Sequence, residues 1–127
     1  MAFTPDNALV WCEIPVTDLA AAQRFYESVF GYEMTQDESG PNPIMFLPYT
    51  DPGVAGHLYP GRPAVPGTGP TVHLQVPDTV EAAQARVKSA GGDIIDGLVV
   101  DIPAGRFGYA TDPDGNSLGL FEPRGAS

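Results

Sequence analysis

One glutamate and the two histidines of this chain have side chains suited to chemistry at a shared site. Glu13 and His73 lie at matching places in a short internal repeat, and His57 lies between them in the sequence. A carboxylate and two imidazoles can hold divalent zinc, iron, nickel or manganese. Glu13 and His73 could instead be a catalytic acid–base pair, because imidazole titrates near neutral pH and a carboxylate can orient it. They could also be polar residues that line a pocket, and this simpler interpretation is the one we favour.

The internal repeat indicates which elements must position these residues. The two halves of the chain superpose with one constant offset, which matches Asp18 with Asp78 and Gly31 with Gly91. In each half an apolar strand precedes an aspartate that can cap a helix, and a glycine follows that can end the helix in the left-handed conformation. The remaining matched pairs are Val16 with Val76 and Ala22 with Ala82. A repeat in this order and spacing predicts two equivalent modules.

Each module is predicted to contain one strand, one helix and three further strands. The first module covers about 8–60, a linker rich in proline and glycine covers about 61–69, and the second module covers about 70–123. The helices are predicted at 19–30 and 80–90, the second capped by Asp78 or Thr79. The predicted strands are 8–15, 32–36, 43–49 and 54–60, then 71–76, 93–100, 105–111 and 117–122.

The clearest turn of the chain joins the last two strands and reads Asp112-Pro113-Asp114-Gly115-Asn116. Proline restricts φ to the range that the turn requires, and glycine and asparagine tolerate the positive φ that reverses the chain, so this is a strong hairpin signal. Together with the first strand and its aspartate, Phe25-Tyr26 and Phe30-Gly31, the hairpin resembles that of the glyoxalase, bleomycin-resistance and dioxygenase superfamily, the vicinal oxygen chelate (VOC) proteins.

This resemblance implies an α+β fold of two tandem βαβββ modules, whose curved mixed sheets enclose a cup-like pocket. It implies a single VOC domain over 1–127. In this family the two halves of a pocket often come from two chains. A homodimer with pockets at the module interface is therefore expected.

The resemblance also implies where metal ligands would lie. Metal-dependent members place them on the first and last strand of each module, commonly seven residues before the helix-starting aspartate, which here gives Trp11 and Thr71. The last-strand position is Gly119 in the second module and falls within about one residue of Gly56 in the first. Tryptophan and glycine side chains offer no ligand atom and threonine is a poor ligand. We therefore expect no divalent metal or other cofactor; the fallback metal set is Glu13, His57 and His73.

The residues expected to contact a ligand are those on the cup side of the strands: Trp11, Glu13, Thr71, His73 and Tyr109. An indole there could stack on a planar ligand and donate one hydrogen bond, or it could fill the space that a metal occupies in relatives. Tyr109 and Phe107 share one face of their strand, and for both residues core and pocket wall are open interpretations.

Composition limits the remaining classes of function. The chain has 127 residues, 43% of them hydrophobic, which suffices for one globular domain. Its net charge of −10 disfavours nucleic-acid and membrane partners. Cys12 is the single cysteine, which precludes an intrachain disulfide and a cysteine-based zinc site. No apolar run approaches the roughly 20 residues of a membrane span, and the N-terminus lacks signal-peptide features, so a cytoplasmic location is expected.

Two main hypotheses of function follow from the resemblance. The first is a homodimer that binds or sequesters a small molecule, such as a drug or a metabolite, in the manner of bleomycin-resistance proteins and without a metal. The second is a metal-dependent lyase, isomerase or dioxygenase of the glyoxalase type that uses the shifted ligands Glu13, His57 and His73. A metal-free isomerase or hydrolase using Glu13 or His73 as base is a third possibility.

Overall fold

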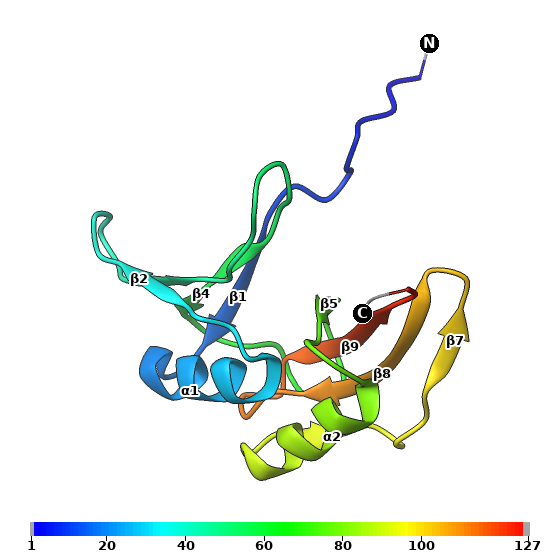
Figure 1. Ribbon diagram of the computed structural model, residues 1–127. Helices are drawn as coiled ribbons and strands as arrows, with labels where there is room; N and C mark the ends of the chain where they lie inside the picture. Colours follow the sequence, from blue (N-terminus) through cyan, green and yellow to red (C-terminus); the bar gives the residue numbers. More distant parts are fainter. Residues whose placement is uncertain (1, 126–127) are drawn as a thin grey trace.

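Two mixed β-sheets, each with its own helix, make up the computed structural model, which describes residues 2–125 (Figure 1). The first sheet has the strand order β1-β4-β3-β2, and the second has the order β5-β9-β8-β6 with β7 paired to β8. In each sheet the first strand runs parallel to the last, β1 to β4 and β5 to β9. The elements are β1 (Cys12–Val16), α1 (Leu19–Phe30), β2 (Thr35–Asp37), β3 (Ile44–Phe46), β4 (Gly56–Pro60), β5 (Thr71–Gln75), α2 (Val80–Ser89), β6 (Asp93–Ile94), β7 (Val100–Ile102), β8 (Gly105–Thr111) and β9 (Ser117–Pro123).

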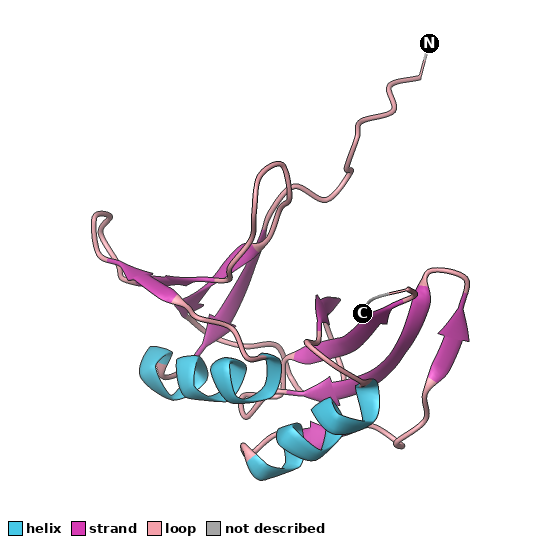
Figure 2. Cartoon of the chain, viewed as in Figure 1, coloured by secondary structure: helices cyan, strands magenta, loops and turns pink. Residues whose placement is uncertain are grey.

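This order confirms the predicted α+β fold of two tandem modules. The two sheets remain open and do not close around a cup within one chain (Figure 2). The N-terminal segment before β1 extends away from both sheets, and its Phe3, Leu9 and Val10 are exposed.

Helix α1 begins and ends where local signals place it. The Asp18 carboxylate accepts a hydrogen bond from the backbone N–H of Ala21, and Gly31 follows the helix with a left-handed φ of 71°. Helix α2 is capped by Thr79, whose hydroxyl accepts from the backbone N–H of Ala82. Asp78 pairs instead with both terminal nitrogens of Arg86, at 2.8 Å each.

Several predicted strands differ from the observed ones. Strand β2 covers Thr35–Asp37 where 32–36 was predicted, and β3 and β4 are shorter than the predicted 43–49 and 54–60. Strand β1 begins at Cys12 rather than at residue 8, because its ladder partner β4 begins at Gly56, directly opposite Cys12. The strand predicted at 93–100 is divided into β6 and β7 by a turn in which Asp96 and Gly97 both have positive φ, 52° and 75°. Both short strands pair with β8.

The hydrophobic core lies between the sheets and the helices. Alternation along the strands buries Ile14, Val16, Met45 and Leu58 in the first module, and Ala110, Leu118 and Leu120 in the second. Helices α1 and α2 also contact each other, and Arg86 Nε donates to the carbonyl of Val29 at 2.7 Å. The opposite face of each sheet is left uncovered by helices.

The β8–β9 turn is held by the first module. Its Asp112 is 3% exposed and accepts a 2.8 Å hydrogen bond from the hydroxyl of buried Tyr26 on α1. Asn116 donates to the carbonyl of Pro15, and the Asp114 carboxylate accepts from the backbone N–H and the hydroxyl of Thr17. These contacts join two modules that are far apart in sequence. Among the described residues, no helix is both long and apolar enough to cross a bilayer.

Candidate functional site

The uncovered face of the first sheet carries an aromatic group around His57, formed by Trp11, Phe46, His57 and Tyr59 and here called the His57 cluster. The His57 ring centroid lies 6.0 Å from that of Trp11 and 6.2 Å from those of Phe46 and Tyr59. Parallel pairing of β1 with β4 sets Glu13 opposite His57, and Trp11 shares the face of Glu13 because side chains two residues apart point the same way.

A chain of polar contacts runs through this cluster. Trp11 Nε1–H donates to His57 Nδ1 at 3.0 Å, and His57 Nε2 lies 3.6 Å from Glu13 Oε1. The His57 side chain is 14% exposed, whereas that of Glu13 is 64% exposed. The structure therefore places Glu13 beside His57, with its carboxylate open to a ligand.

Glu13 and His57 line a hollow of about 340 Å³, together with Asp37, Ile44, Tyr59 and the 39–42 loop. This volume lies at the small end of the range for small-molecule pockets. The backbone N–H of Ser39 donates to Asp37 and lowers the pKa of that carboxyl group. The hollow is therefore lined by two acidic side chains, those of Glu13 and Asp37.

The uncovered face of the second sheet carries a matching group around His73, here called the His73 cluster: His73, Phe107, Tyr109 and Phe121. The His73 ring meets Phe107 edge-on with centroids 5.1 Å apart, and Tyr109 at 5.9 Å. Partial burial lowers the pKa of His73, which favours the neutral imidazole. Thr71, at the start of the same strand, shares a 2.6 Å hydrogen bond with Ser117. Tyr109 is 38% exposed, so it belongs to this open face rather than to the core.

Gly119 lies under the imidazole of His73. The two residues are paired across β5 and β9, and a Cβ atom at position 119 would overlap the His73 ring, Nδ1 first. A glutamate side chain could not leave Gly119 in this direction unless His73 moved. The ring of His73 thus occupies the space next to the backbone where metal-dependent relatives are expected to carry a carboxylate.

The strand register also identifies the counterpart of Gly119 in the first module. His73 pairs with Gly119, and Glu13, the repeat partner of His73, pairs with His57. The equivalent position is therefore His57 and not Gly56, one residue from the sequence-based expectation. Gly56 has a different role: a Cβ there would overlap the carbonyl and sulfur of Cys12, so only glycine allows this close strand pairing.

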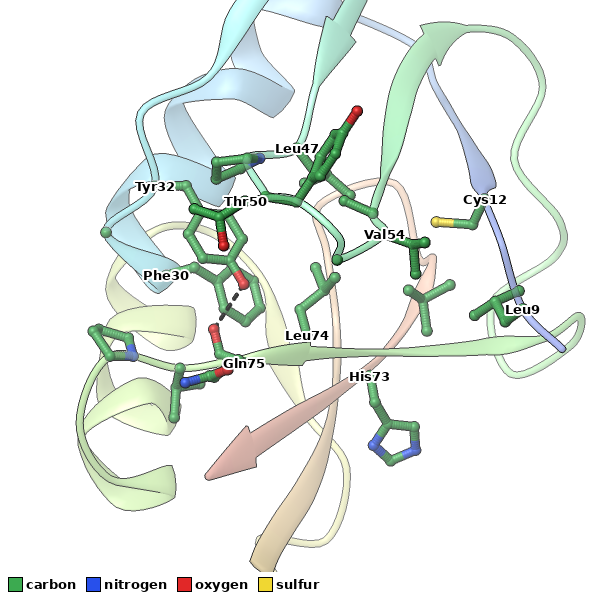
Figure 3. Close-up of a pocket in the computed structure, with 18 residues that line it drawn as sticks. Leu9, Cys12, Phe30, Tyr32, Leu47, Thr50, Val54, His73, Leu74 and Gln75 are labelled. Atoms are coloured by element: carbon green, nitrogen blue, oxygen red, sulfur yellow. Dashed lines mark hydrogen bonds between the residues drawn. The ribbon is translucent and has the colours of Figure 1, made fainter. Parts of the chain in front are cut away.

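Another hollow, of about 570 Å³, lies between the modules, and His73 is the one cluster residue that borders it (Figure 3). It is bordered by β5, the end of α1 and the 47–55 loop, and the hydroxyl of Tyr32 donates to the carbonyl of Gln75 beside it at 2.7 Å. Of the five predicted ligand-binding residues only His73 borders it, and Figure 3 shows the His73 ring on the side of β5 opposite Leu74, pointing away.

Within one chain, the structure brings Trp11, Glu13 and His57 together and places Thr71, His73 and Tyr109 on the other sheet. Glu13 and His73 line different hollows. Within residues 2–125 no group of three or more His, Cys, Asp or Glu side chains is placed to hold a metal ion.

Sequence reasoning missed three aromatic members of the two clusters: Phe46, Tyr59 and Phe121. Tyr59 and Phe121 follow His57 and Gly119 by two residues, so strand alternation could have found them. Phe46 reaches His57 only through the antiparallel register of β3 with β4, which no local pattern carries.

Comparisons with known proteins agree with this architecture. A curated relative from Mycobacterium bovis, CFP32, is 27% identical over 116 residues, which are 88% of this chain and 44% of the relative, so the chain spans less than half of its length. TnmS3, an antibiotic binding protein from Streptomyces sp. CB03234, superposes with a TM-score of 0.62 at 25% identity, covering 94% of this chain and 99% of that one.

A second solved structure, the fosfomycin resistance protein FosX from Listeria monocytogenes, superposes with a TM-score of 0.68 at 17% identity, covering 98% of this chain and 96% of FosX. The family model described as Glyoxalase/Bleomycin resistance protein/Dioxygenase superfamily matches residues 8–120. The chain belongs to the glyoxalase/bleomycin resistance protein/dioxygenase superfamily.

Proposed function

We propose that this protein binds an organic small molecule without a divalent metal, in pockets that form where the uncovered sheet faces of two copies meet. The observation that carries the proposal is the pair of aromatic clusters on those faces, each centred on a histidine. Rings arranged edge-on around an imidazole offer flat apolar surface with few fixed polar groups, which is typical of small-molecule pockets.

The donor set supports binding without metal. Of the four positions where the family's ligands are expected, Trp11 and Gly119 offer no ligand atom and the Thr71 hydroxyl is already bonded to Ser117. His57 alone remains, and its Nδ1 accepts from Trp11. Metal-dependent members rely on a metal ion to polarise substrate oxygens. The side chains at these four positions are poor ligands for such an ion.

Pairing of two copies is proposed because each face is half of an enclosure. Single chains leave Tyr109, Leu9 and Tyr49 exposed, at 38%, 66% and 51%. A second copy facing them would bury this apolar surface and shield the ligand from water. The similarity to an antibiotic binding protein is in line with a binding role. The net charge of −10 and the acidic lining at Glu13 and Asp37 favour ligands that carry a positive charge.

A thermal-shift screen of planar aromatic compounds, including cationic antibiotics, tests the binding role. A ligand at about 100 times its Kd adds about 2.7 kcal/mol to the stability. For a chain of 127 residues this raises Tm by about 10 °C. Circular dichroism checks that Tyr109→Ala is folded, and this variant should abolish the shift because it removes a ring of the His73 cluster. Arg62→Ala, in the linker outside both clusters, is the control and should keep it.

Light scattering on the eluted peak of a gel-filtration column should give twice the mass of one chain. A monomer at all concentrations would contradict the shared pocket. Turnover of a glyoxalase-type substrate that depends on added Zn²⁺ or Ni²⁺, with no stabilisation by any organic ligand, would contradict the metal-free binding role.

A further inference from the structure

The contact between Trp11 and His57 has consequences for which chemistry the first sheet can support. Glu13 Oε1 and His57 Nε2 are 3.6 Å apart. Two ligands bound at about 2.1 Å to one tetrahedral ion are separated by about 3.4 Å. Distance alone would therefore allow these two atoms to bind the same metal ion. The position of the proton on the His57 imidazole opposes it.

We propose that Trp11 fixes the tautomer of His57 and thereby closes this face to divalent metals. An indole N–H can only donate, so His57 Nδ1 must carry the lone pair in their 3.0 Å hydrogen bond. A neutral imidazole has one N–H, which then lies on Nε2. That proton lies on the side of the ring that faces Glu13, whose Oε1 is 3.6 Å from Nε2, too far for a direct hydrogen bond.

Metal binding requires the opposite arrangement. A metal at His57 Nε2 needs the lone pair on that atom, which moves the proton to Nδ1. The Nδ1–H would then face the indole N–H of Trp11, donor against donor. Histidines that bind metals instead donate their second N–H to a carbonyl, a carboxylate or water. Trp11 thus occupies an expected ligand position and also opposes ligation by its neighbour.

The packing holds Trp11 in this role. Its ring lies edge-on to Phe46 and to Tyr49, with centroids 6.1 and 5.9 Å away, so rotation of the indole away from His57 would break both contacts. His57 is itself largely shielded, with 14% of its side chain exposed. The tautomer is therefore set by fixed neighbours and not by solvent.

This arrangement also refines the ligand class, a step that rests on the proposed binding function. With the proton on Nε2, the hollow beside Glu13 presents a hydrogen-bond donor next to a charged acceptor. The complementary ligand group both accepts and donates, as a carboxamide or a hydroxyl does. A bare cation would satisfy Glu13 but leave the His57 N–H without a partner.

Nitrogen-15 NMR of the histidine rings tests the tautomer directly. In a His73→Gln background His57 is the single remaining histidine, and two-bond proton–nitrogen correlations identify its protonated nitrogen. At pH 8 we expect the proton on Nε2. A proton on Nδ1 would overturn the proposal without involving any variant of Trp11, and without bearing on whether an organic ligand binds.

Zn²⁺ titration by calorimetry tests the consequence for metals. Trp11→Phe keeps an aromatic ring but removes the N–H, and it should bind Zn²⁺ about 10 to 100 times more tightly than the wild type, the usual size of effects from groups behind a ligand. Trp11→Gln offers an acceptor to Nδ1–H and should gain at least as much. The double variant Trp11→Phe/His57→Gln must lose the gain, which separates this site from loose binding to surface carboxylates.

Equal Zn²⁺ affinity in wild type and Trp11→Phe would overturn the proposal, as would a gain that persists without His57. Circular dichroism and Tm establish that each variant is folded. The thermal-shift screen reports on ligand binding, whereas NMR and Zn²⁺ titration report on the tautomer. A failure of the binding function can therefore be distinguished from a failure of the tautomer assignment.

Discussion

Replacing Tyr26 with phenylalanine tests whether the contact between the modules depends on one buried hydrogen bond. The Tyr26 side chain is fully buried, and its hydroxyl donates to Asp112 Oδ2 at 2.8 Å. Burial, followed by the charge of Asp112, raises the pKa of Tyr26 well above its ordinary value, so the hydroxyl remains a donor throughout the neutral range. The change removes only this oxygen.

The expected loss follows from the partners that Asp112 retains. Its carboxylate also accepts from the backbone N–H groups of Asp114 and Asn116 and from the Asn116 side chain, each at 2.9 Å. A hydrogen bond to a charged group contributes about 1.5–3 kcal/mol. Because three partners remain, we expect a loss of about 2 kcal/mol. With an unfolding entropy of about 2.1 cal/mol/K per residue, this lowers Tm by about 7 °C in a chain of 127 residues.

Urea unfolding followed by circular dichroism measures this loss. Tyr109→Phe is the matched control, because it removes a hydroxyl from a partly exposed ring and should change stability by less than about 0.5 kcal/mol. The Tyr26→Phe and Asp112→Asn variants should also be non-additive in a double-mutant cycle. A loss no larger than that of Tyr109→Phe, or full additivity with Asp112→Asn, would refute the reasoning.

Two further predictions concern the second sheet. Burial lowers the pKa of His73 below the ordinary value of 6.5, so on acidification the unfolded chain binds this proton at a higher pH than the folded chain does. The free energy of unfolding therefore falls as the pH drops from about 6.5 through the lower pKa of the folded state. Urea unfolding at pH 7.5 and 5.0 should therefore show a larger drop for the wild type than for His73→Gln, and equal drops would contradict the assignment. Gly119→Ala should cost about 1–3 kcal/mol through overlap with the His73 ring. The same substitution in a His73→Ala background should cost much less, and an undiminished cost would show that the strain lies elsewhere.

Local signals account for the parts of the fold that the sequence predicted well. Helix α1 was predicted at 19–30 and is observed at Leu19–Phe30. Its start depends on one capping carboxylate and its end on one glycine with positive φ, and both lie within the helix's own segment. The β8–β9 hairpin was recognisable for the same reason, because its turn residues set the reversal by themselves.

The ends of strands and the contacts between side chains on different strands were harder to predict from the sequence. A strand ends where its partner ends, so the start of β1 at Cys12 depends on Gly56 in β4, which is distant in the sequence. The internal repeat matches Glu13 with His73, and the structure places them on two different sheets, because a match in a repeat does not imply contact. Whether the pair meets across two copies stays a prediction.

The sequence by itself determined the family, the two-module order and the absence of a metal-binding side-chain atom at Trp11 and Gly119, because residue type and spacing along the chain are enough for these. Only the tertiary structure decided that Glu13 pairs with His57, that Trp11 donates to His57 Nδ1, and that the His73 ring covers Gly119. The physical reason is that each contact joins two strands whose register is set by the packing of the whole sheet.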